Sequence, residues 1–185
     1  LPCSPAAEGA APAPHPYRAP KPGAARGRPD PIRGVHPDID RRAVERLNDL
    51  VASVCTVRDL VNEPVSSLNA VQLASELRTL CRNAQVKFQV LDKAQIEALG
   101  MGGLLAVNKG SVDPPTFSIL EYKPKKAVNA KPIVLVGKGV VYDTGGLSLK
   151  PTPNSMDYMK CDMAGGACVA GAIAAAALLE LPVHV

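Results

Sequence analysis

The residues best suited to chemistry lie in one glycine-rich stretch, Val136–Gly166. Four of its charged residues are the candidates for chemistry: Lys138, Asp143, Lys150 and Asp162. Glycines let a loop turn sharply and let its backbone approach a ligand closely. Carboxylates gathered in such a loop repel one another unless a cation lies between them, and a divalent metal ion would meet that need. The residue types therefore indicate a metal site, although each residue taken singly also fits an ordinary surface loop.

Other site chemistries find less support. The phosphate-binding pattern G-x-x-x-x-G-K-[ST] is absent, and Gly137-Lys-Gly139 gives only part of the dinucleotide pattern, so a nucleotide-binding domain rests on glycines alone. No G-x-S-x-G turn for a serine nucleophile is present. Cys161 and Cys168 have no histidine near them, and we interpret them as small packing residues. The three histidines are scattered and we expect none to bind metal: His15, His36 and His184.

Composition limits the classes of protein to consider. The 185 residues are 46% hydrophobic and 3% aromatic, enough for a core built from aliphatic side chains. A net charge of +4 is too small to favour nucleic acid or an anionic membrane as partner. Five cysteines without a C-x-x-C pair fit reduced thiols in a cytoplasmic protein. The uncharged stretch Ala164–Leu179 is rich in alanine and glycine, and we interpret it as a buried helix rather than a membrane span.

The first 37 residues differ from the rest. Ten of the 18 prolines fall there, interleaved with alanine, glycine and arginine. A segment without a periodic apolar face cannot offset the entropy lost on ordering. We therefore predict a disordered tail or linker at residues 1–37 and a folded unit at residues 38–185.

Hydrophobic periodicity and capping residues predict four helices. Apolar residues recur at steps of three and four from Val44 to Val61, with Asp40 as a plausible N-cap and Pro64 ending the helix near Asn62. The other three helices are expected over residues 71–83, 92–99 and from about 163 onward.

Short apolar runs predict the strands. They fall at residues 86–91, 104–107, 116–122, 133–136 and 183–185. The run at 133–136 is apolar throughout, which is typical of a central strand buried on both faces. Helices that alternate with strands imply an α/β fold, with helices around a mixed, mostly parallel central sheet.

Several separate motifs resemble those of the leucyl aminopeptidase (cytosol aminopeptidase) family. The glycine-rich stretch is similar to the family's V-G-K-G, [FY]-D-[ST]-G-G-[LI]-S-[LI]-K and M-D-x-M-K-x-D-M elements. Arg58–Pro64 resembles R-D-L-V-N-x-P, and Met101–Ser111 resembles the stretch that leads into the central sheet. The resemblance covers about Asp40 to Val185, in the family's order.

The resemblance implies a role for each residue of the site. Lys138 matches the lysine whose neutral amine binds one metal ion, and Asp162 matches a carboxylate ligand of the same ion. Asp143 matches the carboxylate that contacts both ions. Lys150 matches a catalytic lysine that stays charged and polarises the scissile carbonyl. The implied cofactors are two divalent ions, manganese or zinc, with magnesium and cobalt as further options.

The resemblance also sets expectations for the whole protein. It implies a hydrolase, a metalloexopeptidase that removes N-terminal residues such as leucine from peptides with a free N-terminus, in a cytoplasmic homohexamer. The family's N-T-D-A-E-G-R motif, which supplies further carboxylates and a catalytic arginine, is not among these residues, and the spacer Pro151–Cys161 is one residue longer than is common. We therefore expect a catalytic domain that is incomplete and, as it stands, inactive. The alternative is a non-catalytic relative that acts as a binding or assembly module.

Overall fold

The computed structural model describes residues 30–33, 38 and 40–185. Almost all of the predicted tail lies outside these residues, so its disorder stays a prediction. The boundary of the folded unit at residue 38 stays a prediction for the same reason.

The predicted helices are confirmed, and their ends follow local capping. Helix α2 (Arg41–Asn62) begins where the Asp40 side chain accepts a hydrogen bond from the backbone N–H of Arg42. It ends at Glu63, whose extended backbone is the conformation that a following proline favours. Helix α3 (Ala70–Asn83) begins in the same way at its own asparagine cap.

Two further helices follow from cap chemistry and from composition. Asp92 and Gln95 exchange side-chain-to-backbone hydrogen bonds at the start of α4 (Lys93–Ala98), which forms a capping box. Helix α6 (Ala164–Leu178) is the predicted alanine-rich helix. A short 3₁₀ helix, η1 (Met156–Cys161), leads into it.

The sheet differs from the prediction. Strands β1 (Lys87–Leu91) and β2 (Phe117–Glu121) pair antiparallel, and within the described residues they form the only sheet. The α/β class is confirmed, but the mostly parallel sheet is wrong for this part of the chain. Residues 133–136 are not a strand: they are exposed, with Val134 at 75% and Val136 at 90%, and the N–H of Ile133 makes a single backbone hydrogen bond, to the carbonyl of His184 at 2.9 Å.

A second predicted strand is a helix. The apolar run at residues 104–107 lies inside α5 (Gly102–Asn108), where it is half-buried or exposed. A run of four apolar residues is compatible with a strand or with a helix. Here the chain passes through a short turn from α4 directly into helix α5.

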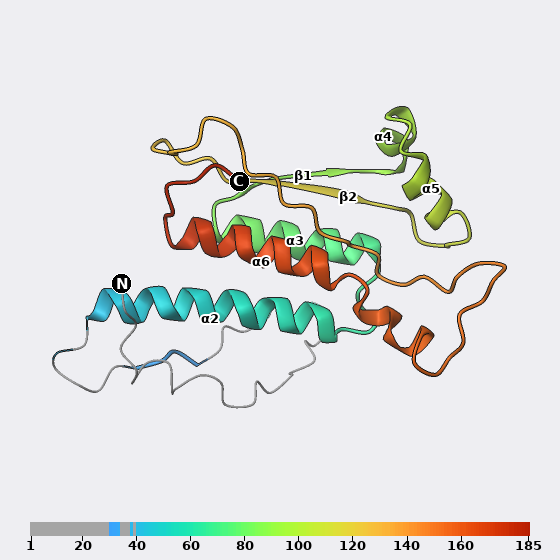
Figure 1. Ribbon diagram of the computed structural model, residues 1–185, viewed down its shortest axis with the longest axis horizontal. Coiled ribbons are helices and arrows are strands. Elements are labelled where there is room, and N and C mark those ends of the chain that lie inside the picture. The colour runs from blue at the N-terminus through green and yellow to red at the C-terminus, as the bar shows by residue number, and fades with distance from the viewer. Residues whose placement is uncertain (1–29, 34–37, 39) are drawn as a thin grey trace.

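The helices and the sheet form layers. Figure 1 shows α2 on one side, α3 and α6 together in the middle, and the β1–β2 pair on the other side, where both α3 and α6 contact the strands. The core between them is built from leucines, alanines and one methionine: Leu60, Leu68, Leu73, Leu77, Met163, Ala167 and Ala170. Residues Met156–Leu178 are long and apolar enough for a membrane span by length and composition, and 44% of their most apolar part is buried inside the protein. In this structure α6 is a helix of the core, as predicted.

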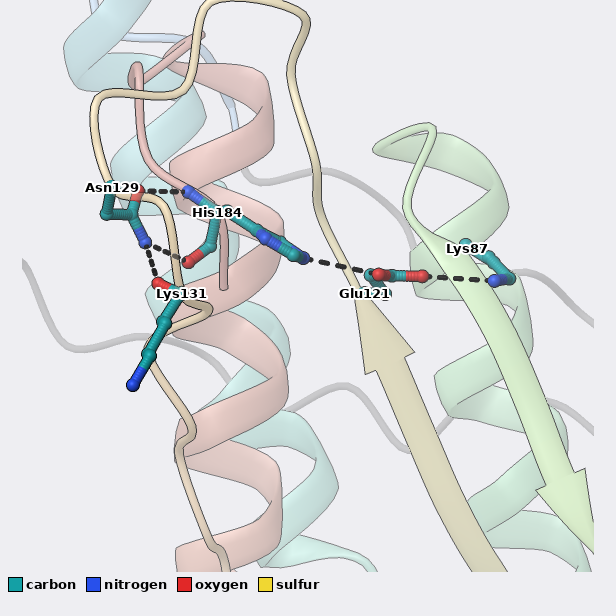
Figure 2. A network of polar contacts seen from close by, with 5 residues as sticks. All are labelled: Lys87, Glu121, Asn129, Lys131 and His184. Atoms are coloured by element: carbon teal, nitrogen blue, oxygen red, sulfur yellow. Dashed lines mark hydrogen bonds and ion pairs between the residues drawn. The ribbon is translucent and has the colours of Figure 1, made fainter.

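The segment at residues 181–185 is held by a polar network that the sequence did not predict (Figure 2). The side-chain oxygen of Asn129 accepts a hydrogen bond from the backbone N–H of His184 at 2.7 Å. The side-chain NH₂ group of Asn129 donates to the His184 carbonyl at 2.8 Å. The buried His184 ring lies 3.2 Å from Glu121, which also pairs with Lys87 at 3.0 Å. Val185 exchanges two backbone hydrogen bonds with Tyr122, so the predicted strand opening is extended chain beside β2. His184 is therefore a structural residue and not an incidental one.

The contact of α6 with α2 depends on the smallness of Gly171. A Cβ at this buried position would lie 2.3 Å from Cγ2 of Val57 on α2. We expect Gly171→Leu to lower the free energy of unfolding by about 1–3 kcal/mol, because the two helices would have to separate. Ala172→Leu, at an exposed position of the same helix, is the matched control and should change the free energy of unfolding by less than about 0.5 kcal/mol. Urea denaturation of both variants measures the difference, and equal midpoints would contradict the packing described.

Candidate metal centre

The first pair of predicted site residues meets at the start of α6. Lys138 lies on the loop after residues 133–136, and Asp162 lies between η1 and α6. The Lys138 ammonium lies 3.2 Å from an Asp162 carboxylate oxygen. The lysine side chain is 63% exposed and the aspartate 19%, so the pair lies at the surface with its carboxylate partly shielded. The N-cap residue of α6 is Met163, which makes no side-chain hydrogen bond to the helix. The Asp162 carboxylate therefore does not cap α6 and is not used up by helix capping.

Glycines bring these two segments together. A Cβ on Gly137 would lie 2.5 Å from the carbonyl oxygen of Gly165 and 2.7 Å from Cα of Gly166. The close approach lets the N–H of Gly166 donate to the carbonyl of Lys138 at 2.7 Å. The backbone that carries Lys138 is thereby attached to the first turn of α6, directly after Asp162.

The second pair closes the loop between Asp143 and Lys150. The Lys150 ammonium donates to the carbonyl oxygen of Asp143 at 2.9 Å and lies 3.2 Å from its carboxylate. The other carboxylate oxygen accepts the N–H of Gly145 at 2.8 Å. Gly145 has φ +94°, and a Cβ there would lie 2.4 Å from the carbonyl oxygen of Ser148, so only glycine allows this turn.

Hydrogen bonding keeps the Asp143 carboxylate ionised. The Gly145 N–H, then Lys150 and more distantly Lys138, hold the pKa of Asp143 below its ordinary value of 3.8. Because this pKa is lowered in the folded chain, the interactions stabilise the fold above the ordinary value, and that stabilisation is lost as the pH falls through the lowered pKa. The carboxylate is therefore charged at neutral pH and is an acceptor only.

The structure adds residues that the sequence analysis did not assign to the site. The Tyr142 hydroxyl donates to the carbonyl of Met156 at 3.1 Å, and the Lys160 ammonium donates to the carbonyl of Asn62 at 3.2 Å. Both bonds fix the 3₁₀ helix that precedes Asp162. Tyr142 and Lys160 stand inside the motifs of the glycine-rich stretch, which was the only sign of their importance.

The donor set fits a divalent metal ion in kind. Two carboxylates and one amine are ligands that hard and borderline cations accept. Each carboxylate has a lysine ammonium at 3.2 Å, and a metal ion bound by Lys138 would take the place of a proton on that ammonium, because an amine binds metal through its lone pair. The number of candidate ligands is small. The described residues contain no group of three or more histidine, cysteine, aspartate or glutamate side chains placed to hold a metal ion.

Comparison with known proteins decides the family. The model of the cytosol aminopeptidase family, catalytic domain, matches residues 55–185, which include both lysine–aspartate pairs. The chain belongs to the cytosol aminopeptidase family. It is 50% identical over 145 residues to a probable cytosol aminopeptidase of Chloroherpeton thalassium, a match that covers 78% of this chain and 28% of that protein. It is 55% identical over 128 residues to one of Chlorobaculum tepidum, covering 69% and 25%.

Solved structures of this family have the same fold. The bottromycin maturation enzyme BotP in complex with Mn is similar with a TM-score of 0.72 and 39% identity, over 81% of this chain and 31% of that one. Leucyl aminopeptidase from Trypanosoma cruzi has a TM-score of 0.70 and 35% identity, over 75% and 27%. The chain thus spans between a quarter and a third of the length of the relatives that it matches.

The glycine contact gives a direct test of the first pair. We expect Gly137→Ala to lower the free energy of unfolding by about 1–3 kcal/mol, because the new methyl group would meet backbone atoms that cannot rotate away. The Gly166 amide should also exchange its hydrogen faster, since its bond to Lys138 is broken. Gly139→Ala is the matched control, with nothing within 4 Å of its Cβ. If the two variants unfold at the same denaturant concentration, the close approach at Gly137 is not needed.

Proposed function

We propose that the chain carries the lysine and aspartate part of the active site of a metal-dependent aminopeptidase that hydrolyses the N-terminal peptide bond of peptides. The proposal rests on one observation: both lysine–aspartate pairs form, at 3.2 Å, on loops within the stretch that matches the family's catalytic domain. In this proposal Lys138, Asp143 and Asp162 are metal ligands and Lys150 is the catalytic lysine. When bound, the metal would supply Lewis acidity and an activated water.

The contacts of Lys150 support its proposed role at a substrate carbonyl. An ammonium group has three N–H donors, and two of them are directed at the carbonyl and carboxylate oxygens of Asp143. One donor is left for the carbonyl oxygen of a scissile bond. The side chain is 26% exposed, which keeps it accessible while its neighbours hold its direction. A donor fixed beforehand stabilises the charge that develops on that oxygen.

The finer features of the activity are proposed from the relatives. Two divalent ions are proposed, and the manganese in the BotP structure supports that metal over zinc, magnesium or cobalt. The relatives from Trypanosoma cruzi and Trypanosoma brucei are named leucyl aminopeptidases, and these names support a preference for N-terminal leucine. A cytoplasmic location and assembly into a homohexamer are proposed on the family resemblance.

A chimera tests the role of Lys150. Residues 55–185 of this chain would replace the matching part of the Chloroherpeton thalassium protein, and hydrolysis of leucine amide would be assayed with Mn²⁺. We expect Lys150→Met to lower kcat by about 100- to 1,000-fold, because an oxyanion donor is lost, with a much smaller change in KM. Lys126→Met, at an exposed position away from the site, is the control and should retain full activity. A chimera that keeps its kcat after Lys150→Met would refute the catalytic assignment.

The chain by itself should be inactive. Its described residues offer two carboxylates and no cluster of three metal-binding side chains, which is too few to hold a pair of metal ions. We expect no release of leucine from leucine amide above the rate of buffer alone, with Mn²⁺ or Zn²⁺ added. Robust, metal-dependent release by the purified chain would mean that its ligand set is complete.

A further inference from the structure

The 3₁₀ helix η1 is held in place by few contacts. None of its side chains is buried, and its backbone hydrogen bonds reach only to residues 151–155 or stay within the helix itself. In the described part of the chain, two side-chain hydrogen bonds link it to other segments: Tyr142 to the Met156 carbonyl at its start, and Lys160 to the Asn62 carbonyl at its end. Lys160 stands two residues before Asp162, so its bond is the nearer of the two to the carboxylate.

The partner of Lys160 is the C-terminus of a helix. Asn62 is the last residue of α2, and the last carbonyls of a helix have no N–H donor within the helix. These carbonyls carry partial negative charge, which favours a cation beside them. The last turn of α2 contains no basic residue, so within the described chain the cation comes from Lys160, 98 positions away in sequence.

We propose that Lys160 is a positioning residue that sets the place of Asp162 by attaching η1 to the C-terminus of α2. The metal-ligand role of Asp162 rests on the proposed function, but the attachment of η1 does not. The bond connects α2, which ends in the Arg58–Pro64 motif, to the motif that contains Asp162. Lys138, from a different segment, lies 3.2 Å from the Asp162 carboxylate. Asp162 is therefore flanked by one contact of its own carboxylate and by one contact of the helix that precedes it.

Hydrogen exchange tests the attachment without any metal. In the purified chain, we expect Lys160→Met to speed exchange of the amides of residues 156–163 by roughly two- to five-fold, the scale of a cation at a helix end. Lys160→Arg should restore slow exchange, because the guanidinium also donates to carbonyls. Lys126→Met is the matched control, and the amides of α3 should exchange alike in all variants. Unchanged exchange at residues 156–163, or a rise that is equal throughout the chain, would overturn the proposal.

Manganese affinity tests the consequence for Asp162. Free Mn²⁺ would be titrated against the chain and bound metal followed by water-proton relaxation. We expect Lys160→Met to weaken binding by about three- to ten-fold, the loss typical when a partner that orients a metal ligand is removed, while Lys160→Arg and Lys126→Met bind as the parent does. Faster exchange with unchanged Mn²⁺ affinity would mean that Lys160 holds η1 without positioning the carboxylate, and would overturn the proposal. If the parent chain binds no Mn²⁺, the proposed function fails, and the exchange experiment alone decides whether Lys160 holds η1.

Discussion

The close approach between Gly137 and the Gly165–Gly166 pair is the contact on which the site depends. It allows the backbone at Lys138 to bond the first turn of α6, and this places the lysine against Asp162. No side chain larger than hydrogen fits at Gly137 without moving backbone atoms. A similar close contact occurs further along α6, where Gly171 has no side chain and so leaves room for Val57 of α2. Helix α6 thus uses small residues twice, once to hold the loop that carries Lys138 and once to pack on α2.

The site is an arrangement of alternating charges rather than a buried polar pocket. Each aspartate has its own lysine, and the more shielded members of the two pairs are Asp162 and Lys150. The Gly145 N–H and the Lys150 ammonium hold the pKa of Asp143 below its ordinary value. A surface pair contributes little to stability, because solvent screens it.

Most helix ends and the two paired strands, predicted at residues 86–91 and 116–122, were predictable from this sequence, whereas the predicted strands at 104–107 and 133–136 were wrong. Asp40, Asp92 and Pro64 fix helix ends through bonds and clashes with their immediate neighbours, so local sequence suffices. A strand needs a partner along its length, and the apolar residues 133–136 are exposed and form no strand in the described structure. The site residues followed from the motifs, but their pairing did not. Lys138 meets Asp162 because Gly137 lies against Gly165 and Gly166, and the roles of Lys160 and His184 depend on contacts with segments far away in the chain.

The central claim is that Lys138, Asp143 and Asp162 together attract a divalent metal ion. A titration of the isotope-labelled chain with Mn²⁺, followed by two-dimensional amide spectra, tests it most directly because the paramagnetic ion broadens the signals that lie nearest to it. The account predicts that the amides of residues 138, 143–145 and 162 broaden first, before those around Asp92 and Asp113, which are exposed aspartates elsewhere on the chain. Broadening that begins at Asp92 or Asp113, or that spreads evenly over all exposed carboxylates, would contradict it.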